Sequence, residues 1–365
     1  MSHVRPRPLF EKLRTTRSLK GLAQNFLLGT MAGQKLFLRA DDLPRVVNIS
    51  FHEKTCFYSC TMCPYAEQAV RDMYRTRSEM SFATLENIVA SMPNDPYYSF
   101  DISAIGETLQ FENLAPFVAY MKAERPRVNT ILSTNGVLLT ERLFLSLAES
   151  GLDSIQISLF AENAADHEAI TKTKTFEKVA ENIRRISRLK KARGLERPYV
   201  QTFMMEAKET EARVAPFVAY WSRFVDKAFG RPIYKIGRPI EGLTPALAGP
   251  PSPRRYPCIV PWYSTAIRAN GDVLHCYMFH WHPGTKDARI GNINEKPLRE
   301  IWGDPEFRRF RAAHRSLELG DYPVCDSCEH WSAYTDVWDR TPGGFSFAPV
   351  RLRDLFTRAP EHRGG

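Results

Sequence analysis

The chain has 365 residues, of which 43% are hydrophobic, enough for one large domain and a smaller one beside it. No apolar run reaches the ~18–20 residues of a membrane span, and Met1–Pro6 shows no secretion-signal core, so we expect a cytoplasmic protein without disulfides. Residues 1–45 hold nine basic and three acidic side chains and thus +6 of the net charge of +9.

The N-terminal extension, residues 1–45, repeats apolar side chains at helical spacing over residues 8–29. We expect a solvated basic helix that packs on the rest of the protein. The alternative is a weak membrane-surface contact through the same apolar side chains. No nucleic-acid-binding motif accompanies the charge, so we expect no nucleic-acid partner.

Residues 46–240 alternate between strand and helix patterns. Strands are predicted at 46–51, 100–105, 130–133, 154–159, 200–204 and 233–236, and helices at 81–92, 112–123, 140–149, 176–191 and 208–227. Repeated β-then-α units form parallel sheets covered by helices. The pattern therefore predicts an α/β fold, a partial (β/α)6 TIM-like barrel with functional residues at the carboxyl ends of its strands.

Residues 241–335 predict a smaller domain that begins with a Pro- and Gly-rich linker over 241–257. Strand patterns at 264–268 and 272–275 flank Asn270-Gly271, a hairpin signal, and short helices follow at 298–302 and 305–315. The tail, residues 336–365, is rich in Pro, Gly and Arg, and we expect it to be irregular.

Seven cysteines divide into a group of three and a group of four. The first group, Cys56, Cys60 and Cys63, has CxxxCxxC spacing directly after the first predicted strand, and the second group consists of Cys258, Cys276, Cys325 and Cys328. An iron–sulfur cubane needs four ligands, so three thiolates leave one iron open, whereas four complete the coordination. The alternative for either group is a zinc site, although structural zinc prefers CxxC pairs and four protein ligands.

The CxxxCxxC loop resembles that of the radical S-adenosylmethionine (SAM) superfamily. The resemblance implies a [4Fe–4S] cluster held by the first group, with SAM bound to its open iron. Gly106-Glu107 resembles the family's GGE segment, with Ile105 in place of the first glycine, and Thr171 stands where an arginine is frequent. The SAM-binding residues that the resemblance implies are Tyr58, Met62, Gly106, Glu107, Ser133, Asn135, Ser158 and Lys174.

The second group, with the hairpin between Cys258 and Cys276, resembles the SPASM/twitch extension of the same superfamily, in the shorter form with one auxiliary [4Fe–4S] cluster. The nearest resemblance is to twitch-type dehydrogenases that act on aminocyclitol alcohols. It implies an oxidoreductase in which a 5′-deoxyadenosyl radical abstracts hydrogen from a small polar metabolite, such as a sugar, aminocyclitol or nucleoside, and the auxiliary cluster accepts an electron. Flavodoxin or ferredoxin would donate electrons. Candidate catalytic residues are Arg238 and His280, while His275 and His282 also flank Cys276.

Three other functions remain open from the sequence. The first is a radical SAM enzyme that modifies peptides or proteins, as many SPASM relatives do. The second is a redox-neutral epimerase or decarboxylase, since an auxiliary cluster can also relay electrons. The third is a non-catalytic zinc or iron–sulfur scaffold, which would cleave no SAM.

Overall fold

The computed structural model describes residues 27, 30–38, 40–54, 56–74, 78–103, 105–232, 255–280, 289–328, 331, 338–341 and 344–347. The predicted helix over residues 8–29, apart from Leu27, lies outside these ranges, as do Arg238 and His282. Among the described residues, no helix is both long and apolar enough to cross a membrane.

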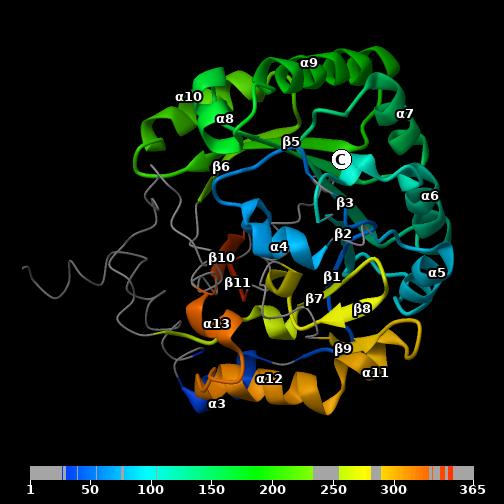
Figure 1. Cartoon of the computed structure of the whole chain (residues 1–365), viewed down its shortest axis with the longest axis vertical. Coiled ribbons are helices and arrows are strands. Elements are labelled where there is room, and N and C mark those ends of the chain that lie inside the picture. Colours follow the sequence, from blue (N-terminus) through cyan, green and yellow to red (C-terminus); the bar gives the residue numbers. More distant parts are fainter. Residues whose placement is uncertain are drawn as a thin grey trace, which may run out of the picture.

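One nine-stranded sheet organises the described chain, in the order β6-β5-β4-β3-β2-β1-β7-β8-β9. Its first six strands along the chain are β1 (Val46–Ile49), β2 (Ser99–Ile102), β3 (Asn129–Thr134), β4 (Ser154–Phe160), β5 (Tyr199–Glu206) and β6 (Lys227–Pro232). Each of these strands pairs in parallel with the next. This topology confirms the predicted α/β barrel-like fold, and Figure 1 shows the strands at the centre with the helices outside.

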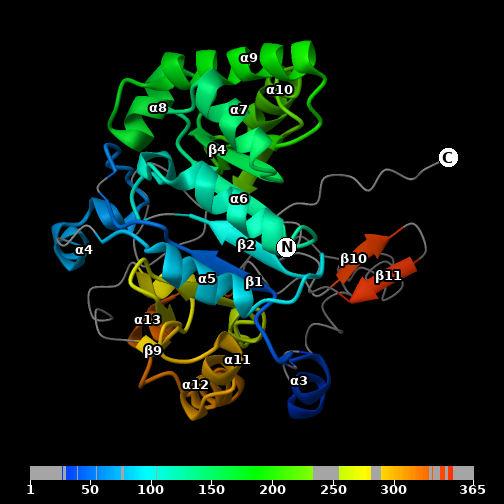
Figure 2. The ribbon, with the colours of Figure 1, turned by 90° about the vertical axis from the view of Figure 1, so that its right-hand side faces the viewer.

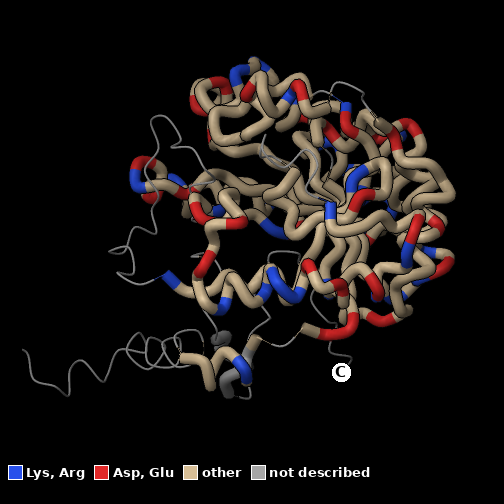
Figure 3. Tube along the Cα trace, turned by 60° about the horizontal axis from the view of Figure 1, so that its bottom comes forward, with Lys and Arg blue, Asp and Glu red and all other residues tan. Residues whose placement is uncertain are grey.

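The helices that cover the outer face of the parallel strands are α5 (Phe82–Ala90), α6 (Leu114–Glu124), α7 (Glu141–Glu149), α8 (Ala164–Thr171), α9 (Phe176–Arg193) and α10 (Glu211–Trp221). Shorter elements near the start of the chain are α3 (Met31–Phe37), η1 (Pro64–Ala66), α4 (Gln68–Met73) and η2 (Thr108–Gln110). Ser81 caps α5 as predicted, because its hydroxyl accepts from the Thr84 amide at 3.1 Å. Acidic and basic residues alternate along the outer helices, and the middle of the fold is largely uncharged (Figure 3).

The sixth strand is earlier than predicted. Helix α10 ends at Trp221 rather than at 227, and the strand occupies Lys227–Pro232, while the predicted 233–236 lies outside the described residues. Side-chain packing explains the shift, since the Phe229 ring lies 5.6 Å from that of Phe203 on β5. A Cβ on Gly230 would lie 2.8 Å from Val214, so glycine here permits the close approach of α10, although it weakens the strand signal.

The C-terminal region continues the same sheet. Its elements are η3 (Val260–Trp262), β7 (Ser264–Ile267), β8 (Asp272–Leu274), η4 (Tyr277–His280), β9 (Arg289–Asn292), α11 (Leu298–Trp302), α12 (Pro305–Ser316) and α13 (Pro323–Ser327). Strands β7 and β8 form the predicted hairpin, but β7 also pairs in parallel with β1. Helices α11 and α12 therefore lie at the opposite end of the sheet from α9 and α10 (Figure 2).

Part of the tail is regular, which corrects the expectation of an irregular segment. Strands β10 (Trp338–Thr341) and β11 (Gly344–Phe347) form an antiparallel pair. Aromatic residues favour strands, and the sequence between the two strands is Pro-Gly, a strong turn signal. The rest of residues 336–365 lies outside the described chain.

A single hydrophobic core spans the barrel and the C-terminal region. It includes Val47 of β1, Ile155 of β4, Ala266 of β7 and Trp302 of α11, all at most 1% exposed. Alternate residues of a strand face opposite sides of a sheet. The strand residues next to Val47 and Ile155 in the sequence therefore line the inner face of the barrel.

Candidate functional site

The CxxxCxxC loop packs against the last turn of α8. The Ser59 amide donates to the Thr171 carbonyl at 3.1 Å, and the Thr61 amide donates to the Ile170 carbonyl at 2.9 Å. The last carbonyls of a helix have no partner within the helix, so the loop satisfies two of them. Lys172, with φ of 60°, then ends the helix in the left-handed conformation. The residues after β4 thus position the cysteines that follow β1.

Tyr58 lies between the first two cysteines in the sequence, is buried, and links the loop to residues in and after α8. Its hydroxyl lies 2.8 Å from Thr175 Oγ1 and 3.3 Å from His167 Nε2. His167 Nδ1 lies 2.8 Å from the Leu159 carbonyl, which only accepts, so Nδ1 carries the proton and Nε2 accepts. Burial lowers the pKa of His167, which keeps the ring neutral. Sequence reasoning missed His167, because a single histidine in a helix gives no signal.

Glu107 connects the ends of β2 and β3. Its carboxylate is 2% exposed and accepts from the Leu109 amide at 3.1 Å, the Asn135 amide at 2.8 Å and the Thr134 hydroxyl. Burial raises the pKa of Glu107, and these three donors oppose that rise. The structure thus brings two of the predicted SAM-binding residues, Glu107 and Asn135, into direct contact.

His52 supports the same segment and was not predicted. Its Nδ1 accepts from the Lys54 amide at 2.9 Å, so Nε2 carries the proton and donates to the Glu107 carbonyl at 2.8 Å. Burial lowers the pKa of His52. Gly106 has φ of +111°, a conformation that favours glycine, so the residue pair after β2 is fixed by both its backbone and its neighbours.

The segment after β3 reaches the first cysteine. Asn135 Nδ2 lies 3.9 Å from Cys56 Sγ, and the Tyr58 amide lies 3.4 Å from the same sulfur. Gly136, with φ of +79°, turns the chain at a point where a Cβ would lie 2.8 Å from Ile157. Asn135 thus contacts Glu107 through its backbone amide and Cys56 through its side chain.

Met62 faces an apolar cluster at the carboxyl ends of β4 and β5, which suits the predicted contact with an adenine ring. The cluster consists of Ala161, Ile170, Phe203, Met205 and Ala207, with Met62, Phe160 and Phe229 packed against it. Phe160 has φ of 67° where the β4–β5 register shifts, directly after Ser158.

The other predicted SAM-binding residues divide into two kinds. Ser133 and Ser158 are partly exposed on β3 and β4, on the inner face of the barrel. Lys174 is placed differently, since its side chain is 85% exposed and its amine lies 3.9 Å from a Glu168 oxygen. The structure therefore does not bring Lys174 into the site, because the turn after α8 directs it to solvent.

A polar group on the inner face of the barrel was not predicted. Asn48 Nδ2 donates to Asp101 Oδ2 at 2.8 Å, and among the described residues Asp101 Oδ1 has no hydrogen-bond partner. Burial raises the pKa of Asp101 to about 7, against the influence of Asn48 and Arg231. Arg231 donates to Gln156 at 2.7 Å, and its guanidinium carbon lies 3.8 Å from the ring centre of Phe203. Four barrel strands, β1, β2, β4 and β6, thus contribute polar side chains to one surface.

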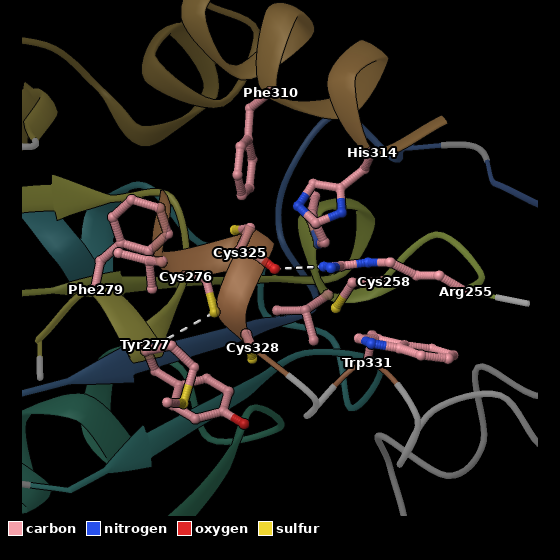
Figure 4. A pocket seen from close by; sticks show the side chains of 14 residues that line it. Arg255, Cys258, Cys276, Tyr277, Phe279, Phe310, His314, Cys325, Cys328 and Trp331 are labelled. Carbon is pink, nitrogen blue, oxygen red and sulfur yellow. Dashed lines mark hydrogen bonds between the residues drawn. The ribbon is translucent and has the colours of Figure 1, made fainter. Parts of the chain in front are cut away.

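The second cysteine group lines one pocket. Cys258 precedes η3, Cys276 precedes η4, and Cys325 and Cys328 lie in and directly after α13. The four cysteines line this pocket together with Phe310 and His314 of α12 (Figure 4). Burial raises the pKa of Cys258 to about 12, so these thiols ionise only when a cationic centre compensates the thiolate charge.

The histidines near Cys276 are buried rather than exposed to a substrate. His280 is 1% exposed, and burial with the nearby Arg268 charge lowers its pKa to about 3. The carbonyl of His280 accepts from the Tyr74 hydroxyl. His275 Nε2 lies 3.1 Å from Glu306 Oε1. A histidine with so low a pKa is a weak proton acceptor at neutral pH, so the predicted catalytic role of His280 gains no support from its surroundings.

The donor set present suits iron–sulfur clusters, whose usual protein ligands are cysteine thiolates. The pocket of the second group is walled by four thiols and apolar side chains, and the CxxxCxxC loop supplies three more thiols.

Comparison with known proteins agrees with this geometry. Residues 52–205 match the radical SAM superfamily model, and residues 258–329 match the SPASM iron–sulfur cluster-binding domain model. The chain is 22% identical over 281 residues to the S-adenosyl-L-methionine-dependent 2-deoxy-scyllo-inosamine dehydrogenase of Niallia circulans, covering 77% of this chain and 91% of that protein.

Two solved structures share the fold. SuiB of Streptococcus suis, bound to S-adenosylmethionine, superposes with a TM-score of 0.52 at 15% identity, covering 77% of this chain and 70% of SuiB. The anSMEcpe structure with bound AdoMet and a peptide has a TM-score of 0.50 at 15% identity, covering 78% of this chain and 86% of that one. The two family matches show that the chain belongs to the radical SAM superfamily and carries a C-terminal SPASM-type domain.

Proposed function

We propose that this radical SAM enzyme oxidises a small polar metabolite by two electrons, as a dehydrogenase. The family matches imply SAM and iron–sulfur clusters. In our proposal Cys56, Cys60 and Cys63 hold the [4Fe–4S] cluster that binds SAM. The four cysteines of the second group hold an auxiliary [4Fe–4S] cluster, and a flavodoxin or ferredoxin donates the electrons.

One observation carries the proposal: Cys258, Cys276, Cys325 and Cys328 all line a single pocket. Four protein thiolates would occupy every iron of a cubane, which leaves no iron open for a substrate. A cluster of that kind is suited to electron transfer, and a two-electron oxidation needs such an acceptor. A redox-neutral reaction needs no net acceptor and is therefore the weaker candidate.

The residues of this chain supply binding and orientation. When bound, SAM and its cluster supply a 5′-deoxyadenosyl radical that abstracts hydrogen from the substrate. Met62 and the apolar cluster after β4 would hold the adenine ring. Glu107 would accept from the SAM ammonium and keep Asn135 beside Cys56, and a buried carboxylate suits an ammonium partner.

The polar inner face of the barrel favours a small polar substrate. Asp101 Oδ1 would accept from a substrate hydroxyl or amine, and Arg231 would donate to a substrate oxygen. Asp101, with a pKa of about 7, is suited to take the proton that an alcohol loses on oxidation. The dehydrogenase from Niallia circulans, whose name specifies an aminocyclitol, supports this substrate class. Arg238 remains a second candidate for substrate contact.

The test is release of 5′-deoxyadenosine by the reduced, reconstituted enzyme with SAM and host extract divided by molecular size. We expect the small-molecule fraction to stimulate release and a ketone or aldehyde product to form. Stimulation only by the macromolecular fraction would instead favour the alternative, a peptide- or protein-modifying enzyme. No release with either fraction, from protein that contains both clusters, would contradict an enzymatic role.

The ligand sets are tested separately by iron analysis. We expect about eight irons per chain in the reconstituted protein, and about four after Cys56→Ser, Cys60→Ser and Cys63→Ser are combined. A matching loss of about four irons is expected when Cys325→Ser and Cys328→Ser are combined. Zinc in place of iron at the second group would refute the auxiliary cluster.

A further inference from the structure

His314 is a polar side chain directed into the pocket of the four cysteines. It lies on α12, is 2% exposed, and lines the pocket together with all four thiols. Its ring points into this pocket, beside Phe310 of the same helix (Figure 4). Within the described residues neither Nδ1 nor Nε2 has a hydrogen-bond partner.

The ring therefore brings a buried donor that needs an acceptor. Burial and the nearby Arg255 charge lower the pKa of His314 to about 3, so the ring is neutral and carries one N–H. Buried N–H groups in proteins are nearly always paired. The pocket lining offers thiol sulfurs, apolar groups, the Arg255 guanidinium, which is itself a donor, and Tyr277, whose hydroxyl points away from His314 (Figure 4). Sulfur is thus the acceptor toward which the ring is placed.

We propose that His314 donates its ring N–H to a sulfur atom of the auxiliary cluster and thereby raises the reduction potential of that cluster. The inference rests on the proposed function, in which the four cysteines hold a cluster. Reduction adds negative charge to a cluster, and a donor to its sulfurs stabilises that charge. His314 would therefore make the auxiliary cluster a better acceptor of the substrate's electron. In this role it is a hydrogen-bond donor to the cluster and not one of its ligands.

The test is an electron paramagnetic resonance redox titration of the holoenzyme with three substitutions. His314→Phe removes the donor and keeps a ring, His314→Gln retains a side-chain N–H, and Phe310→Leu changes the same wall without removing a donor. We expect the auxiliary potential to fall in His314→Phe, to return part of the way in His314→Gln and to stay unchanged in Phe310→Leu. The SAM-binding cluster, identified by its spectral response to added SAM, is the internal reference and should not move.

Two results would overturn the inference. One is an unchanged auxiliary potential in His314→Phe protein with full iron content. The other is loss of about four irons in both His314 variants, which would indicate a ligand or packing role. Because no substrate is needed, these outcomes do not depend on the reaction. Wild-type protein that takes up only one cluster would instead refute the proposed auxiliary site itself.

Discussion

The Glu107 side chain links the segments that follow β2 and β3 by hydrogen bonds. Both carboxylate oxygens accept from backbone amides, one from Leu109 and the other from Asn135. In Glu107→Gln the side-chain amide must face one of these N–H donors, so a buried donor loses its acceptor. We expect the free energy of unfolding to fall by about 1–3 kcal/mol.

The affinity for SAM should also fall in Glu107→Gln, because the Asn135 amide loses the carboxylate oxygen that accepts its hydrogen bond. Urea denaturation and equilibrium dialysis with SAM measure the two effects. The exposed Glu112→Gln is the matched control, and unchanged SAM binding in Glu107→Gln would contradict the proposed role.

Asp101 predicts a dependence of stability on pH. Its folded pKa is raised from the ordinary 3.8 to about 7 by burial, so the folded protein favours the protonated form. The stabilisation from that proton is complete below about pH 4 and is lost as the pH rises through 7. We expect wild type to lose stability relative to Asp101→Asn between pH 5 and pH 8, by at most about 1.4 kcal/mol per pH unit. Thermal melts at both pH values check this, and a parallel pH response of the two proteins would refute the shift.

At the scale of single residues, the sequence predicted those site residues that belong to a recognisable local motif. The CxxxCxxC cysteines, Glu107 and Asn135 belong to local patterns that follow strand ends, and Cys325 and Cys328 form a local CxxC pair. Asp101, His167 and His314 each stand alone in the sequence, and their surroundings arise only when strands or helices distant along the chain come together. Their roles therefore required the structure.

Among the elements, the β7–β8 hairpin was predicted because its turn is encoded locally. Gly271 has φ of +89°, and a Cβ there would lie 2.5 Å from Asn294 Nδ2. Strand β6 was misplaced because Lys227–Pro232 contains a glycine and a proline, and its strand character comes from packing on β5. Local propensity cannot report a pairing of that kind.

Gly271→Ala should consequently disturb the cluster that depends on the hairpin. We expect iron content to fall from about eight toward about four per chain, because Cys276 directly follows β8. The control is Gly194→Ala, which has a similar φ of +61° but no atom within 4 Å of the added Cβ. Equal iron content in both variants would show that the turn does not position Cys276.

In the whole molecule, β1 is an interior strand shared by the barrel and the C-terminal region. The Val46 amide donates to the Tyr263 carbonyl and the Ser50 amide to the Ile267 carbonyl, both at 3.0 Å. The sequence predicted the barrel and the extension as neighbours, but it could not show that one sheet joins them. Which strand lies beside β1 is decided by contacts between segments far apart in the chain.

A chain that ends after residue 240 should therefore fail to fold stably, because it exposes one edge of β1 and half of a continuous core. We expect loss of hydrogen-exchange protection across β1 and aggregation. A chain that ends after residue 331 keeps β7–β9 and all seven cysteines, and it should remain protected. A soluble, protected 1–240 fragment would show that the barrel is independent.

The contact of Arg255 with α13 closes a long loop of the chain, and closing a loop costs conformational entropy. Arg255 donates to the carbonyls of Cys325 and Asp326, which lie 70 and 71 positions along the chain. Closing a flexible loop of that length costs on the order of 4 kcal/mol, beyond a constant term. The Arg255 contact closes this loop with protein groups alone, and it holds the segment after residue 255, which carries Cys258, beside the helix that carries Cys325. Arg255→Gln should accordingly take up iron more slowly during reconstitution while reaching the same final content, and an unchanged rate would show that the loop is closed by other contacts.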